Sequence, residues 1–173
     1  MRPLLILATV TFASLLAATA NVDPCTPPKP VAQYLALHPG WRIETIADLV
    51  PDDQKLWAQY HKGRCPGLAR VALDTGGKIS FALALLGNRG GKASEQLIVL
   101  KPAGTDFKTF VLQPPFEGGR SVVWRAAPGK SSDMDTGRAL TIPHDSIVFE
   151  EMESASQQFY FQRGKFHMLQ TSD

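Results

Sequence analysis

Along most of the chain after Gly67, hydrophobic and polar residues alternate in short runs, which glycine, proline or polar turns separate. A period of two residues places every second side chain on the same face, and this predicts β-strands with one buried face. Short strands joined by such turns are typical of antiparallel sheets, because parallel βαβ units need a helix between strands. We expect strands at residues 68–73, 79–86, 96–101, 107–112, 121–126, 138–142, 146–151, 157–163 and 165–170.

A helical period occurs near the start of the chain. Residues 51–62 begin with a proline and two aspartates, which suit the first turn of a helix, and place Leu56, Trp57 and Tyr60 on one face. A shorter helix fits residues 31–37. The chain therefore has few helices beside many strands.

These elements predict a mainly β fold. We expect a single domain of residues 21–173, built as a β-sandwich or as one strongly curved antiparallel sheet. One short helix near residues 51–62 covers an edge of the sheet. The roughly 150 residues of this domain suffice for one hydrophobic core.

Residues 1–20 have the pattern of a signal peptide. Arg2 supplies the positive start, residues 4–18 are almost entirely apolar, and small residues precede a cleavage site after Ala20. The apolar run is short for a membrane span. The acidic residue and proline before Cys25 do not fit a lipoprotein site. We expect a periplasmic or secreted protein without a stable membrane anchor.

The charge of the chain is almost balanced. The formal net charge is +2, and it falls to +1 without residues 1–20, which contain Arg2 and no acidic residue. Such a balance gives no broad basic surface for nucleic acid or an anionic membrane. We therefore expect a protein partner and no nucleic acid.

Cys25 and Cys65 are the two cysteines of the chain. In an exported protein this pattern predicts one disulfide, which excludes both sulfurs as nucleophiles. The bridge would tie the proline-rich residues 24–30 to the rest of the domain and stabilise the fold by about 4 kcal/mol.

Known catalytic motifs are absent from the sequence. It contains no GxSxG elbow, no HExxH motif, no phosphate-binding loop and no dinucleotide fingerprint. Glu151 and Glu153 would share one face of a strand, as a carboxylate pair of the glycosidase type requires, but neighbouring exposed acids at a strand end are far more common. We expect no enzymatic activity and no cofactor.

The turn Asp74-Thr75-Gly76-Gly77 lies between two predicted strands, where some β-proteins bind calcium. It resembles a degenerate calcium loop of the FG-GAP type, G-D-x-D-G-D-G-x-x-D. In that alignment Asp74 is the one acidic ligand left, since Ala72, Gly76 and Ser80 occupy the other acidic positions. Calcium needs six to eight oxygen ligands, several of them carboxylates. We expect a tight glycine turn and no metal.

The resemblance extends to most of the domain. Trp57, residues 65–69, the glycine turn, residues 81–83 and the aromatic hairpin before Ser172 follow one another as in a group of small exported bacterial β-proteins. Some related β-proteins look like periplasmic immunity proteins or lysozyme inhibitors, which insert loops into the substrate cleft of peptidoglycan hydrolases. The resemblance thus implies a binding protein that occludes the active site of a cell-wall hydrolase.

Two loops are candidates for such binding. One is the turn Glu117-Gly118-Gly119-Arg120, and the other is the polar segment 127–137 with the residue that follows it. Cations and hydroxyls in these loops could reach the acidic residues of a hydrolase. An envelope interaction or adhesion module is the alternative function, and a hydrolase with an unfamiliar site is the third. The candidate partner-binding residues are Arg120, Lys130, Ser131, Ser132, Asp133 and Arg138.

Overall fold

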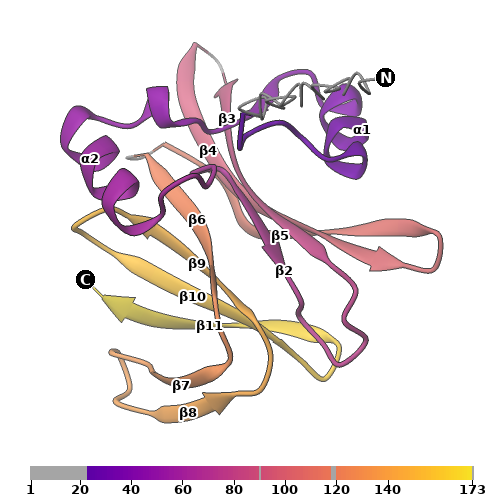
Figure 1. Ribbon diagram of the computed structural model, residues 1–173, viewed down its shortest axis with the longest axis vertical. Coiled ribbons are helices and arrows are strands. Elements are labelled where there is room, and N and C mark those ends of the chain that lie inside the picture. Colours follow the sequence, from indigo (N-terminus) through magenta and orange to yellow (C-terminus); the bar gives the residue numbers. More distant parts are fainter. Residues whose placement is uncertain (1–22, 90, 118–119, 173) are drawn as a thin grey trace, which may run out of the picture.

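The computed structural model describes residues 23–89, 91–117 and 120–172 (Figure 1). The predicted signal peptide, with its cleavage after Ala20, lies outside these residues, as do Gly118 and Gly119 of the first predicted binding loop. Within the described part, no helix combines the length and apolar character that a membrane crossing requires.

The described chain folds into short helices followed by a series of strands. The helices are α1 (Lys29–Leu37), η1 (Ile46–Asp48) and α2 (Pro51–Tyr60). The strands are β1 (Trp41–Ile43), β2 (Leu68–Val71), β3 (Ser80–Arg89), β4 (Lys92–Ala103), β5 (Asp106–Phe116), β6 (Ser121–Ala126), β7 (Gly129–Ser132), β8 (Ala139–Ile142), β9 (Ser146–Glu151), β10 (Ser156–Gln162) and β11 (Lys165–Ser172).

Two antiparallel sheets form the body of the molecule. The first sheet has the order β1-β3-β4-β5, and β2 also pairs with β3, while the second has the order β11-β10-β9-β6. A separate hairpin, β7–β8, lies at one end of the second sheet (Figure 1). The sheets do not close into a barrel, so the predicted mainly β fold is confirmed as one consistent with a β-sandwich.

Hydrophobic clusters pack on both faces of the first sheet. Leu97 and Val99 of β4 pack toward the second sheet, in a cluster that includes Ile147 and Phe159. The alternate residues of β4 face the opposite side, where Val31 of α1 covers them. Because both faces are covered, residues 97–100 in the middle of β4 are all apolar and do not alternate.

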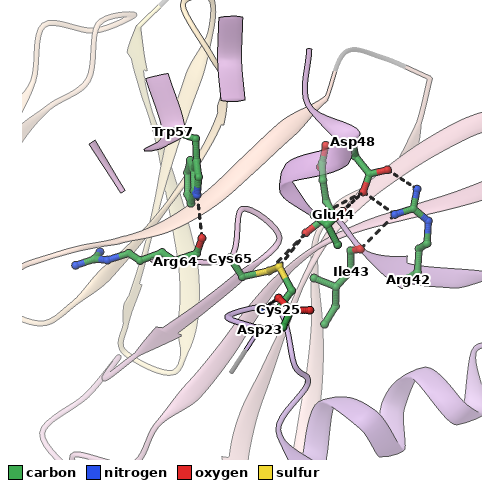
Figure 2. The surroundings of a disulfide bond; sticks show 10 residues. Asp23, Cys25, Arg42, Ile43, Glu44, Asp48, Trp57, Arg64 and Cys65 are labelled. Atoms are coloured by element: carbon green, nitrogen blue, oxygen red, sulfur yellow. Dashed lines mark hydrogen bonds and ion pairs between the residues drawn. A yellow bond between two sulfur atoms is a disulfide. The ribbon is translucent and has the colours of Figure 1, made fainter. Parts of the chain in front are cut away.

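The predicted disulfide between Cys25 and Cys65 is confirmed (Figure 2). It fixes the segment before α1 to the loop that leads into β2. Its sulfur atoms lie 3.9 and 3.5 Å from the carbonyl oxygen of Glu44. These are packing contacts, because the sulfurs of a disulfide carry no hydrogen.

Some predicted elements differ from the observed ones. The helix predicted for residues 51–62 ends at Tyr60. Strands β3 and β4 continue almost to the tip of their hairpin, so the turn predicted for residues 87–91 is shorter. Strand β5 runs through Pro114 and Pro115, where we expected a turn. It lies at an edge of its sheet, and its register with β4 shifts between Gln113 and Phe116, so both prolines stand at an irregularity where a missing N–H is tolerated.

Candidate functional site

The predicted binding residues lie in two separate places. Arg120 directly precedes β6, whereas Lys130 and its neighbours follow the other end of the same strand. Figure 1 shows β6 running from the end of the molecule near α2 to the end that carries the β7–β8 hairpin. The two loops therefore do not form one continuous binding surface.

The segment predicted as an irregular loop, residues 127–137, is in part a strand. β7 pairs with β8, which places Lys130 opposite Thr141 and Ser132 opposite Ala139. Side chains that face each other across a strand pair lie on the same side of it. All four are exposed, so they form the outer face of the hairpin.

The inner face of the hairpin packs on the second sheet. Leu140 and Ile142 belong to a small cluster with Tyr160 of β10 and Leu169 of β11. Ser131, on the same inner side, donates a hydrogen bond from its hydroxyl to the side chain of Gln158. An amphipathic pattern of this kind fixes which face the hairpin presents to solvent.

Asp133 holds the turn of the hairpin against β11. Its carboxylate accepts hydrogen bonds from the hydroxyl of Thr136, at 2.7 Å, and from the main-chain N–H of Gln170, at 3.3 Å. The N–H of Met134 donates to the carbonyl of Gln170, at 2.8 Å. Asp133 and Ser131 thus use their polar atoms within the protein, while the side chains of Lys130, Ser132 and Arg138 face outward or lie exposed.

Arg120 lines a cleft of about 360 Å³ at the other end of the molecule. The cleft lies where the ends of β4 and β9 meet the first turn of α2. It is lined by Val50, Asp53, Leu86, Ala93, Glu95, Arg120, Glu151 and Met152. Carboxyl groups from three elements therefore line the same cleft as one guanidinium group.

Glu95 is the buried carboxyl group of this cleft. Its Oε2 atom accepts hydrogen bonds from the N–H and the hydroxyl of Ser121, at 3.2 and 3.1 Å. Burial raises the pKa of Glu95 to about 7, against the opposing effect of these hydrogen bonds, and the nearby charge of Glu151 adds to the rise. Glu95 can therefore take up or release a proton near neutral pH.

Glu44 lies deeper and is 1% exposed. Neither of its carboxyl oxygens has a hydrogen-bond partner within the described residues. Burial raises the pKa of Glu44 to about 9, and the charges of Glu95 and Asp48 raise it further than the nearby arginines lower it. The group is therefore a neutral acid at pH 7.

The main chain of Glu44 is held between β2 and β3. Its N–H donates to the carbonyl of Ala84, at 3.1 Å, and its carbonyl accepts from the N–H of Gly67, at 3.0 Å. A Cβ atom on Gly67 would come within 2.5 Å of the Glu44 main chain, so this position requires glycine. Beside it, Arg42 and Asp48 form two hydrogen bonds of 2.7 and 2.6 Å (Figure 2).

The carboxylate of Asp74 in the glycine turn forms an ion pair with Lys101. The Nζ atom of Lys101 lies 2.6 Å from a carboxylate oxygen of Asp74, and the N–H of Gly76 donates to the other oxygen at 3.0 Å. Within the described residues, no three histidine, cysteine, aspartate or glutamate side chains are grouped so that they could bind a metal.

Sequence reasoning missed Glu44 and Glu95. Glu95 has a weak signal, since it stands two residues before the apolar residues 97–100 of β4, within the predicted sheet. Glu44 follows a strand of three residues, which is too short to show a period.

Comparison with known proteins adds no relative. No family model matches the chain, and neither the curated proteins nor the solved structures contain a significant match. The fold and the clefts therefore define the protein only as a disulfide-bonded, mainly β molecule.

Proposed function

We propose that the protein is an exported binding protein that inhibits a cell-wall hydrolase. The outer face of the β7–β8 hairpin carries the proposal. It presents Lys130 and Ser132 on a paired strand, and Arg138 directly precedes β8. The cationic groups would enter the substrate cleft of the hydrolase and block it without any chemical step.

The chemistry of the hairpin suits such a target. Glycoside hydrolases of the cell wall act through carboxyl groups on either side of the scissile bond. A lysine or arginine placed against such a carboxylate, out of contact with water, forms a strong charge-assisted hydrogen bond. The exposed side chain of Met134 at the tip, 54% accessible, adds apolar area that can be buried in the same contact.

The anchoring of the hairpin to the second sheet supports its choice as the binding element. Hydrogen bonds of Ser131 and Asp133, together with the packing of Leu140 and Ile142, hold the hairpin in one conformation before it binds. A loop that is already ordered loses less conformational entropy on binding. Localisation in the periplasm or outside the cell, where such hydrolases act, agrees with the disulfide.

A panel of purified peptidoglycan hydrolases tests the function. The mature protein, residues 21–173, is added to each enzyme, and lysis of cell-wall substrate is followed by turbidity, with the protein alone as a further arm. We expect stoichiometric inhibition of at least one hydrolase and no lysis by the protein alone.

Other results would favour the other two functions. Lysis by the protein alone, lost in Glu95→Gln, would favour a hydrolase that uses the cleft at Arg120. No inhibition, together with recovery of an envelope protein other than a hydrolase on the immobilised protein, would favour an interaction or adhesion module.

A further inference from the structure

The two sheets are joined along a seam between β2 and β6, which lie side by side in Figure 1. The seam is attached at two points. At one, the N–H of Val123 donates to the carbonyl of Pro66, at 2.7 Å. At the other, the N–H of Ala72 donates to the carboxylate of Asp145, at 2.9 Å, and the N–H of Asp145 donates to the carbonyl of Ala72, at 3.2 Å. Within the described residues, no hydrogen bond crosses the seam between these two attachments.

Main-chain groups of both strands point into the open part of the seam. Gly67 bonds to β3 through Ala84, so the alternation of an antiparallel ladder turns the N–H and C=O of Arg70 away from β3. Val123 bonds to Pro66, so by the same alternation the N–H and C=O of Arg125 point away from β9. These are the free hydrogen-bonding groups of two strand edges.

A cleft of about 360 Å³ lies over this seam. Arg64, Arg70 and Arg125 line it, together with the half-buried ring of Trp124. Its volume is at the lower end of the range for ligand sites, about 300–1,000 Å³. Arg64 and Arg70 are exposed, and neither forms an ion pair within the described residues.

Arg125 is held in place by an acid. Its Nε atom lies 2.7 Å from Oδ2 of Asp145, which is 9% exposed. Burial alone would raise the pKa of Asp145, but the hydrogen bonds from Arg125 and from the Ala72 N–H outweigh it and lower the pKa. The ionised carboxylate therefore fixes the guanidinium group at the wall of the cleft and leaves its terminal nitrogens available.

Aromatic rings form the end of the cleft near α2. His61 stacks on Trp57, with ring centroids 4.2 Å apart, and lies 5.2 Å from Trp124. Burial lowers the pKa of His61, and the charge of Arg64 lowers it further, which favours the neutral imidazole. The indole N–H of Trp124 donates a hydrogen bond to a carboxylate oxygen of Glu150, at 3.0 Å.

We propose that this cleft binds a short acidic peptide of a protein partner. Its carboxylates would pair with Arg64 and Arg70, and its main chain would bond to the free edges of β2 and β6, with one apolar side chain against Trp124. Charge complementarity and unpaired strand edges together favour a peptide, because peptides supply both carboxylates and main-chain partners. The site is independent of the β7–β8 hairpin and of the proposed inhibition.

Peptide binding to the full mature protein tests the proposal. The probe is an amidated pentapeptide with two glutamates around a leucine, and its matched control has two glutamines in their place. Binding is followed by tryptophan fluorescence and by amide shifts in NMR spectra. We expect the acidic peptide to bind at least tenfold more tightly, with shifts concentrated at Arg70 and Arg125.

Single-residue variants distinguish a specific binding site from non-specific electrostatic attraction. Arg64→Gln and Arg70→Gln, which remove exposed cations without breaking an ion pair, should each weaken binding about tenfold. Lys165→Gln, an equal loss of charge at the start of β11, should leave it unchanged. Circular dichroism checks that each variant is folded.

Three results would overturn the proposal. The first is equal binding of the acidic and the glutamine peptide, and the second is no binding of either. The third is a short oligonucleotide that displaces the acidic peptide from the same residues at lower concentration, because this would identify a general anion site. None of these results bears on inhibition by the hairpin.

Discussion

Glu44 is a buried acid whose ionisation opposes folding. Its carboxyl oxygens have no hydrogen-bond partner within the described residues, and burial raises its pKa from the ordinary 4.5 to about 9. Between these two values the folded protein holds a proton that the unfolded chain has released. The free energy of unfolding therefore falls as the pH rises, by at most about 1.4 kcal/mol per pH unit for one group.

Replacement of Glu44 with glutamine should remove this dependence. Ionisation of Glu95 also lowers the free energy of unfolding as the pH rises. Because its pKa is about 7, this effect falls mostly below pH 7. The interval from pH 7 to 9 therefore reports on Glu44. We expect Glu44→Gln to unfold at a denaturant concentration close to that of the wild type at pH 5, and to be more stable by about 2 kcal/mol or more at pH 8.

Denaturant unfolding across this pH range is the measurement, with Glu153→Gln as the exposed control. A wild-type stability that stays constant between pH 7 and 9 would contradict the assignment of Glu44 as a neutral buried acid. So would an equal slope in the wild type and in Glu44→Gln.

The sequence alone could not identify the buried acids Glu44 and Glu95. Trp57 was correctly expected in the core, because its helical face was visible in the pattern, and it is 2% exposed. Glu44 and Glu95 lie far apart in the chain, and their mutual influence arises only when β1 and β4 pair with the two edges of β3. No local pattern carries that information.

Among the elements, the β7–β8 hairpin divides most clearly into side chains that anchor it to the second sheet and side chains that face solvent. Asp133 bonds to Thr136 and to Gln170 of β11, and this fixes the turn. The outward-facing Lys130 and Ser132 are then carried on a fixed frame. The function of the hairpin should therefore depend on residues that touch no partner.

Asp133→Ala should loosen the hairpin while the rest of the fold stays intact. Loss of two hydrogen bonds to a carboxylate destabilises this element by about 1–3 kcal/mol. We expect faster hydrogen exchange at the amides of Met134 and Gln170, and several-fold weaker inhibition. Asp135→Ala, in the same turn but with no hydrogen bond within the described residues, is the control, and equal exchange in the two variants would contradict the anchoring role.

Most strands could be predicted, and the exceptions have physical reasons. Strands such as β6 and β9 match their predicted bounds because each contains a short apolar run that turn residues delimit. β1 has three residues and β7 consists of glycine, lysine and two serines, so neither has an apolar period. Both become strands through pairing with neighbours that have one.

At the scale of the whole molecule, the disulfide and the mainly β class followed from composition and pattern. The order of the strands did not, because it depends on which edges meet. The seam between β2 and β6 is the clearest case, since its attachments join residues such as Pro66 and Val123 from distant parts of the chain. The separation of Arg120 from the hairpin by the length of β6 is another.

This arrangement leads to three surfaces with different chemistry. The carboxyl groups around Arg120 lie near α2, the three arginines line the seam, and the basic hairpin lies at the other end of β6. The proposed inhibition assigns the hairpin alone to the hydrolase. Variants on the three surfaces should therefore have separable effects.

The most direct test compares inhibition constants for one inhibited hydrolase. Lys130→Ala with Arg138→Ala, combined in one protein, should weaken inhibition at least a hundredfold, because the loss of each cation that pairs with a buried carboxylate costs about 2 kcal/mol or more. Lys165→Ala and Arg120→Ala, which remove cations from the exposed start of β11 and from the opposite end of β6, should inhibit like the wild type. Wild-type inhibition by the folded double variant, or a loss of inhibition confined to Arg120→Ala, would contradict the account.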